Sequence, residues 1–208
     1  MEKAFGFSGM GVRNGVTAAA VVYEGFTGVW DILEGEHNVL DALSPSPSPE
    51  EMIKDLGSHF WVTETAIKPY PVGYPIQAAL GAFFALHREH GLTVDNVASV
   101  TVNLSEDGAR IVNGRSMPDG NCQQMVAPAL IDGSVTFEST HAYERMSDPE
   151  LLAVKERVSL VPSAALMDRD APRSAKVEVV LNSMQDGGAF YPPRLWHSPE
   201  PDGHRERK

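Results

Sequence analysis

Apolar positions recur at three- and four-residue steps near the start of the chain. They comprise Val12, Val16, the pair at 19–20 and Tyr23, and Gly25 stands where such a helix would end. We therefore expect an apolar helix here, entered through a glycine-dense run. A helix that looks buried yet opens the chain suggests an incomplete functional unit, because nothing nearby in the sequence covers it.

The next segment mixes short amphipathic pieces with a proline-rich break. Residues 30–33 and 39–43 favour short helices, and residues 44–49 alternate serine with proline. Alternate prolines forbid a helix and favour an extended linker. After a further short helical stretch at 51–56, we place the end of a first unit at residue 57, so that the helical segment and linker span 1–57.

From residue 58 the pattern alternates between strand and helix periods. Helices are expected at three places: 76–90, which stops at Gly91; 123–131, closed by Gly133; and a start at Asp148 with Pro149 in the first turn. Strands are expected at 59–67, 98–104, 158–161, 175–181 and 189–191, with an irregular loop over 68–75. This order is typical of a compact α+β domain, placed at 58–191, and residues 192–208 are expected to form a tail.

The composition excludes several classes of partner and site. A formal net charge of −11 over 208 residues argues against nucleic acid and anionic membranes. Cys122 is the only cysteine, which excludes a disulfide framework and favours a reducing compartment. No long apolar run or signal-peptide layout is present, so a cytoplasmic location is expected.

Three motifs carry a resemblance to a known family. The first is the run 3–15, with Gly-Phe-Thr-Gly at 25–28 and Leu-Glu-Gly at 33–35 behind it. The second is Ile-Lys-Pro-Tyr-Pro at 67–71, and the third is Val-Ala-Pro-Ala-Leu-Ile-Asp-Gly at 126–133. In order and spacing they resemble the MmgE/PrpD family of 2-methylcitrate dehydratases, cis-aconitate decarboxylases and iminodisuccinate epimerases.

The resemblance implies a division of the fold between chains. Family members combine a large all-helical domain with a smaller inserted α+β lid domain. Residues 1–43 resemble the last helices before the lid, and 58–191 resemble the lid itself. The helical half that carries the family's aspartate and histidines is then expected on a second polypeptide. We expect a hetero-oligomer, either a heterodimer or a dimer of heterodimers.

Lysines are the first candidates for a site that binds di- or tricarboxylates, since such a site needs fixed cations beside an acid and a base. Lys3 precedes a glycine-rich turn into a helix, where backbone N–H groups favour anions. It matches a lysine in the family's active site, and a solvated terminal lysine is the alternative. Lys68 is restrained by Pro69 in a loop, so a site role is favoured over a plain surface charge.

Five further residues complete the predicted site. Arg13 lies on the apolar helix and must meet a carboxylate, of the protein by preference or of a ligand. Tyr70 and Tyr74 can donate to substrate oxygens or simply pack. Gly73 lies in the segment 72–75, which takes the place where the family often has a cysteine or histidine together with an arginine. Gln124 stands where some members have a catalytic tyrosine. Glutamine can hold a carboxylate but cannot act as a general acid.

Other candidate chemistry is weaker. His87 and His90 have a spacing compatible with metal ligation, but without a third ligand a solvated helix end is favoured. Cys122 is expected to be an inert thiol. The sequence has no phosphate loop, dinucleotide fingerprint or metal motif, so neither cofactor nor metal is expected.

Two hypotheses follow from these features. The first is a subunit of a divided enzyme that dehydrates or decarboxylates a small di- or tricarboxylate, with epimerisation or isomerisation of a similar acid as the alternative reaction. The second is a non-catalytic binding or scaffold protein that retains the lid fold.

Overall fold

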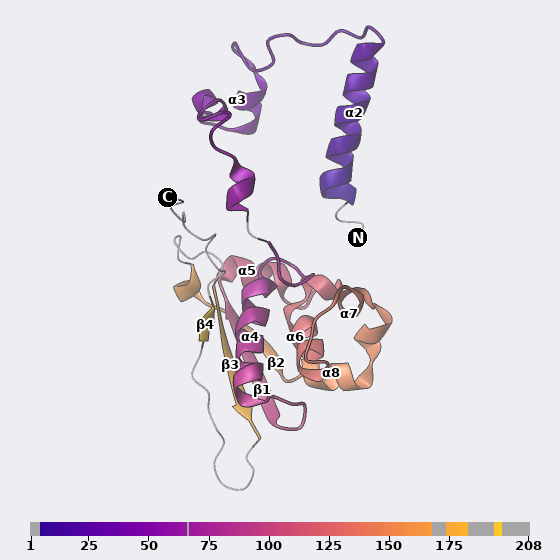
Figure 1. The fold of residues 1–208 in the computed structure, drawn as a ribbon, viewed down its shortest axis with the longest axis vertical. Coiled ribbons are helices and arrows are strands. Elements are labelled where there is room, and N and C mark those ends of the chain that lie inside the picture. The colour runs from indigo at the N-terminus through magenta and orange to yellow at the C-terminus, as the bar shows by residue number, and fades with distance from the viewer. Residues whose placement is uncertain (1–4, 66, 168–173, 183–193, 197–208) are drawn as a thin grey trace, which may run out of the picture. The chain divides into compact units, whose positions relative to one another are not determined.

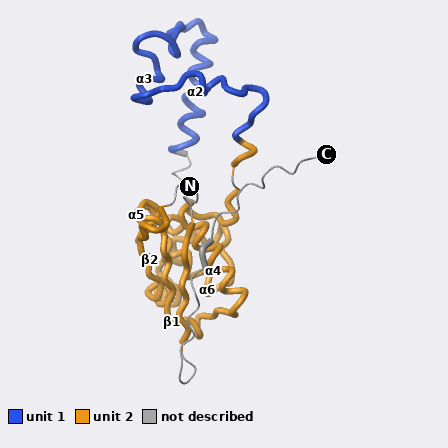
Figure 2. Tube along the Cα trace, turned by 90° about the vertical axis from the view of Figure 1, so that its left-hand side faces the viewer, with its two compact units in different colours: residues 1–61 blue, residues 62–208 orange. Residues whose placement is uncertain are grey.

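The computed structural model describes residues 5–65, 67–167, 174–182 and 194–196. The chain divides into two compact units, residues 1–61 and 62–208 (Figure 2). Each unit is described by itself. The domain boundaries expected at 57/58 and 191/192 stay predictions. None of the helices in the described residues is both long and apolar enough to cross a membrane.

The first unit begins with a continuous helical segment. A π-helix, η1 (Phe5–Gly9), leads into α2 (Met10–Tyr23), which confirms the predicted helix. The helix ends at Tyr23 and is capped by Glu24. Gly25 follows the cap, with a φ of 93° that favours glycine and an N–H that donates to Val22 O at 3.0 Å. No residue of α2 is buried. Its apolar side chains therefore lie open to solvent within this unit.

The rest of the first unit is short and irregular. The α3 helix (Val39–Leu43) is capped by Asn38, whose Oδ1 accepts hydrogen bonds from two backbone N–H groups of the first turn. A 3₁₀ turn, η2 (Pro49–Met52), follows the proline-rich segment. Residues 30–33 form bends and turns, so the helix predicted there is wrong. No residue of this unit that the structure describes is buried.

The strand predicted at 59–67 is also wrong. Residues Trp61–Glu64 form a 3₁₀ turn, η3, and the other described residues of this segment have no regular structure. The segment has β-branched and aromatic content, but no strand of the described sheet pairs with it. Without a partner strand, the backbone groups of an extended segment gain no ladder hydrogen bonds.

The second unit is built on a mixed four-stranded sheet with the order β2-β1-β3-β4. The central strand β1 (Val97–Leu104) pairs in parallel with β2 (Val158–Pro162) and antiparallel with β3 (Ala175–Leu181). The short β4 (Arg194–Trp196) pairs with β3 and lies in the segment predicted as a tail. The strand expected at 189–191 lies outside the described residues.

Helices cover one face of this sheet. Figure 1 shows α4 (Ile76–His90) lying along β1 and β3, while α6 (Cys122–Ile131) contacts α4 and β2. Along β1 the side chains at 100, 102 and 104 are buried and those at 101 and 103 only half-buried, which is the alternation of a sheet with one packed face. The core lies between this face and the two helices, which confirms an α+β fold.

Helix ends in the second unit agree closely with local sequence signals. The α4 helix has the predicted bounds and ends at Gly91, whose φ is 58°. The α8 helix (Pro149–Lys155) is capped by Asp148, as predicted. Two short helices, α5 (Glu106–Val112) and α7 (Phe137–His141), were not predicted. The remaining 3₁₀ turns are η4 (Pro118–Gly120), η5 (Glu144–Ser147) and η6 (Ala164–Leu166).

Candidate functional site

The loop at 68–75 is tied to the first turn of α4. The buried Gln77 side chain donates from Nε2 to Tyr70 O at 2.8 Å and to Val72 O at 3.1 Å. Its Oε1 accepts from the Tyr70 N–H at 3.2 Å. One amide therefore satisfies three backbone groups of the loop. This arrangement fixes the second motif as an ordered surface beside the helix.

Gly73 joins this loop to the turn that precedes α6. Its N–H donates to Asp119 O at 2.6 Å. A Cβ atom at position 73 would lie 3.3 Å from that oxygen and 3.7 Å from Gly120 Cα. Glycine thus permits a close approach between two backbones. The turn continues directly into α6, where Asn121 Oδ1 accepts from the Gln124 N–H at 3.0 Å.

This packing brings four predicted site residues to neighbouring segments. Tyr70, Gly73 and Tyr74 lie in the loop. Gln124 lies in the first turn of α6, the helix that follows the turn contacted by Gly73. Sequence spacing alone separates the two segments by about fifty positions. The contact was not predictable from either motif, although Gly73 itself was selected as a site residue.

Tyr70 and Lys68 differ in their surroundings. The Tyr70 ring is half-buried and stacks on Phe84 with a centroid distance of 5.4 Å. Burial raises the pKa of its hydroxyl, and the nearby Arg88 partly offsets that rise. The hydroxyl is therefore protonated at neutral pH and can donate. Lys68 is exposed, with its Nζ 6.0 Å from the centroid of the half-buried Tyr74 ring.

Gln124 is buried and incompletely satisfied. Its relative exposure is 1%, and its Oε1 has no hydrogen-bond partner among the described residues. An unpaired buried carbonyl oxygen costs about 1–3 kcal/mol, so the side chain offers an acceptor to a donor group. A substrate carboxylate could be bound only through the amide nitrogen, since the oxygen accepts and does not donate.

The structure does not test a site role for the two basic residues of the first motif. Lys3 lies outside the described residues. Arg13 is exposed on α2, with its Nη1 3.9 Å from Met10 Sδ. No carboxylate of the described residues pairs with it, so the expected structural ion pair is not present there. Arg13 also belongs to the first unit, whereas the loop at 68–75 belongs to the second.

Among the described residues, Cys122 and His87 both lie in apolar surroundings. Cys122 is fully buried, and burial raises the pKa of its thiol to about 12, which keeps it protonated and agrees with an inert thiol. The His87 ring lies against Phe83 and Phe84, with centroid distances of 6.2 and 6.4 Å. No group of three metal-ligating side chains occurs in the part of the chain that the structure describes.

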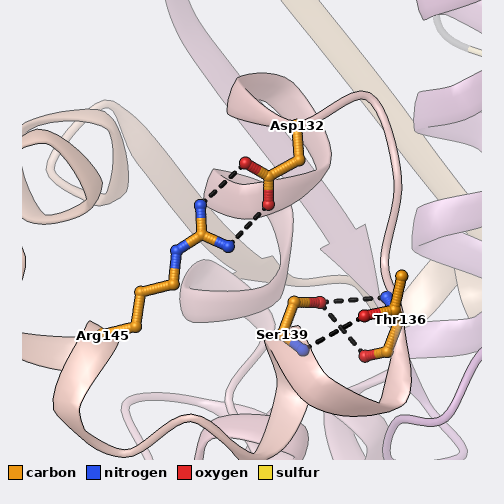
Figure 3. Close-up of polar contacts among 4 residues, drawn as sticks. All are labelled: Asp132, Thr136, Ser139 and Arg145. Carbon is orange, nitrogen blue, oxygen red and sulfur yellow. Dashed lines mark hydrogen bonds and ion pairs between the residues drawn. The ribbon is translucent and has the colours of Figure 1, made fainter.

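The third motif ends in a network that sequence analysis missed. Asp132 caps α6 and accepts two hydrogen bonds from the Arg145 guanidinium, at 2.6 and 2.7 Å (Figure 3). The bond to Asp132 raises the pKa of Arg145. Thr136 and Ser139 form a reciprocal capping box at the start of α7 (Figure 3). Thr136 is a usual N-cap residue, but Ser139 stands where the capping-box signature has Glu or Gln. An ion pair between residues 13 positions apart has no sequence signal.

Comparison with known proteins gives a family match for most of the second unit. The family model described as the MmgE/PrpD C-terminal domain matches residues 70–207. It includes Tyr70, Gly73, Tyr74 and Gln124, begins two residues after Lys68, and excludes Arg13. A search of curated proteins found no match. Since the matched segment covers well over half of the chain, the protein belongs to the MmgE/PrpD family, whose members are dehydratases or related enzymes, and carries that family's C-terminal domain.

Proposed function

We propose that this chain is a subunit of an enzyme that acts on a small di- or tricarboxylate by dehydration or decarboxylation. Epimerisation or isomerisation of a similar acid is the alternative, because it can share the same carbanion-forming step. The observation that carries the proposal is the packing of the loop at 68–75 against the start of α6 through Gly73 and Asp119. This contact links the loop that follows the second motif to the turn that leads into α6, the helix that carries most of the third motif.

The residues of this region suit the binding of a carboxylate substrate. Lys68 supplies an exposed cation at the start of the loop, and Tyr70 supplies a protonated hydroxyl. Gln124 is buried in the first turn of α6, where the helix dipole favours an anion, and its Oε1 has no hydrogen-bond partner among the described residues. We assign Lys68, Gln124 and, on the resemblance of the first motif, Lys3 to catalysis. Tyr70, Gly73, Tyr74 and Arg13 are assigned to substrate binding.

Proton removal next to a carboxylate also needs a positioned base. We infer that this base comes from a second, helical polypeptide that packs on α2. Every residue of α2 is at least partly exposed, and a Cβ atom at Gly11 or Gly15 would meet nothing within 4 Å. An isolated helix of this length is marginally stable in water, so a covering partner would supply the missing stabilisation.

A non-catalytic binding or scaffold role is the second candidate, and burial of Gln124 favours it. This residue occupies the position of a family tyrosine yet is 1% exposed and cannot donate a proton in acid catalysis. If the position contributes only to the core, the domain would keep its fold without its chemistry.

Purification of the tagged full chain from its native cells, with its bound partners, tests the proposal. The complex and the chain alone are each incubated with a panel of di- and tricarboxylates, and substrate loss is followed by proton NMR. We expect no turnover by the chain alone and turnover that rises with the amount of complex formed. Turnover by the chain alone, abolished by Lys3→Ala, would contradict the divided site. A stable complex without turnover would support the scaffold role.

A further inference from the structure

The α2 helix has two different sides. One carries small residues at four-residue steps, namely Gly11, Gly15 and Ala19. The other borders an open groove lined by Val16, Thr17, Ala20, Val21, Glu24 and Phe26. Val16 is 66% exposed and Phe26 68% exposed, so the groove presents apolar surface to solvent. An apolar surface of this kind marks an interaction site.

The groove side has a self-complementary sequence. Positions 13, 16, 17, 20, 21 and 24 are spaced i, i+3, i+4, i+7, i+8 and i+11, which places them on one helix face. Arg13 occupies the first of these positions and Glu24 the last. Valines lie next to the charges, and the smaller Thr17 and Ala20 lie at the centre. Reversal of the direction therefore exchanges the charges and preserves the apolar pattern.

Both terminal charges lack a partner within the described residues. The Arg13 guanidinium contacts Met10 Sδ at 3.9 Å, and neither Arg13 nor Glu24 forms an ion pair there. Eleven residues of helix separate them by about 16 Å, so they cannot pair with each other. Glu24 also stands at the C-terminal end of α2, where the helix dipole disfavours an anion. A cation from another molecule would give Glu24 an ion-pair partner and would offset its unfavourable interaction with the helix dipole.

We infer that the groove side of α2 binds the same side of a second copy of this chain in the antiparallel direction. With the two-fold axis midway between positions 18 and 19, Arg13 lies beside Glu24 of the second copy, and the reverse pair forms at the other end. Val16 then faces Val21 of the second copy. Such an interface is isologous and closes at two chains. A parallel pair would place like charges together.

The inferred interface extends the proposed function without depending on it. The side with Gly11, Gly15 and Ala19 stays available for the helical partner, so both contacts can form on one helix. Self-association of the chain needs neither that partner nor a substrate. The two proposals share Arg13, because a guanidinium that pairs with Glu24 of the second copy is not available to a substrate at the same time. Oligomeric state and turnover are measured separately, so failure of one proposal is distinguishable from failure of the other.

Charge exchange tests the inference in the full-length chain. Sedimentation velocity between about 5 and 200 µM should show a reversible monomer–dimer equilibrium. Arg13→Glu alone or Glu24→Arg alone should raise the dimer Kd by about tenfold or more, because each places like charges together twice. The double variant Arg13→Glu/Glu24→Arg should restore the Kd to within about threefold, since both pairs are rebuilt in reverse.

Gly11→Glu is the matched control on the opposite side of α2, where a new side chain meets nothing within 4 Å. It should leave the dimer Kd within about twofold of the original value. Circular dichroism checks that each variant keeps its helix content. A chain that stays monomeric throughout the range would overturn the inference. A dimer that ignores both single reversals, or one that the double variant fails to restore, would overturn it as well.

Discussion

Lys68 is the residue whose proposed role is most directly measurable. It is exposed at the start of an ordered loop, and no core contact depends on it. In the assembled enzyme, Lys68→Ala should remove a charge-assisted hydrogen bond of about 1.5–3 kcal/mol. We therefore expect kcat/KM to fall by about one to two orders of magnitude, measured by steady-state kinetics.

Lys155→Ala provides the control, because Lys155 lies in the last turn of α8, in the same unit but far along the chain from the loop. It should leave kcat/KM unchanged. Urea unfolding of both variants should match that of the original chain. A folded Lys68→Ala enzyme with unaltered kinetics would remove Lys68 from the site.

Gln124 and Gln77 form a natural pair for a stability test, since both are buried glutamines with opposite hydrogen-bond satisfaction. The Gln124 Oε1 has no partner in the described residues, whereas the Gln77 amide makes three bonds to the loop. Gln124→Met removes an unsatisfied polar atom and should raise the free energy of unfolding by about 1 kcal/mol. Gln77→Met should lower it by about 1–3 kcal/mol.

Urea unfolding of the full chain measures both changes. Equal destabilisation by the two substitutions would mean that the Gln124 amide is satisfied in solution. If Gln124 serves a substrate, the stabilised variant should also lose activity in the assembled enzyme, which is the usual exchange between stability and function at a site.

Cys122 gives the molecule a defined dependence on alkaline pH. Burial raises the pKa of its thiol to about 12 in the folded state, above about 8.5 in the unfolded chain. The folded state then holds the proton more tightly. Stability is complete below about pH 8.5 and falls by about 1.4 kcal/mol per unit as the pH rises toward 12.

Urea unfolding at pH 7.5 to 10.5, in steps of about half a unit, isolates this effect when it is compared with Cys122→Ala. The variant loses the thiol and should show a flatter decline, although its baseline is lower because a small cavity remains. Parallel curves for the two proteins would show that the thiol titrates normally.

At the scale of elements, the contact between the loop at 68–75 and η4 is the feature that assembles the candidate site. Gly73→Ala would place a Cβ 3.3 Å from Asp119 O, within a backbone contact already held by a 2.6 Å hydrogen bond. The two segments must then separate slightly. We expect a loss of about 1 kcal/mol in stability and a larger proportional loss of kcat/KM, measured by urea unfolding and kinetics.

Gly120→Ala is the matched control across the same contact. Its new Cβ would meet only Met117 Cβ, at 3.9 Å, which is an ordinary packing distance. Stability and kcat/KM should therefore change little. Equal effects of the two substitutions would mean that the close approach at Gly73 does not hold the site together.

At the scale of the whole molecule, two helices of similar length differ in how many of their residues are buried. The α4 helix buries ten of its fifteen residues, and α2 buries none of its fourteen. Most helix stability in proteins comes from tertiary packing. In the isolated chain, α2 amides should therefore exchange with solvent deuterium within seconds to minutes, while α4 amides are protected by nearly the full free energy of unfolding.

Hydrogen-exchange mass spectrometry resolves the two helices as separate peptides. Addition of the helical partner should slow exchange in α2 and leave α4 unchanged. Protection of α2 in the isolated chain at dilutions where it is monomeric would show that the helix is already covered, and the proposed partner surface would be lost.

Local signals determined much of this protein from sequence alone. The α4 bounds, its end at Gly91 and the Asp148 cap of α8 follow from interactions within one or two helical turns, which neighbouring residues control. The three motifs likewise indicated the family that residues 70–207 confirm. The α2 helix and its apolar positions were also predictable, because helix periodicity is a property of the local sequence and does not depend on a packing partner.

Only the tertiary structure decided which of these patterns found partners. Residues 59–67 have the composition of a strand but no neighbouring strand, whereas the short β4 forms because β3 offers an edge. The approach of Gly73 to Asp119 and the burial of Gln124 depend on segments distant in sequence. Backbone pairing and side-chain burial are set by the whole fold, so local sequence could propose these residues but could not bring them together.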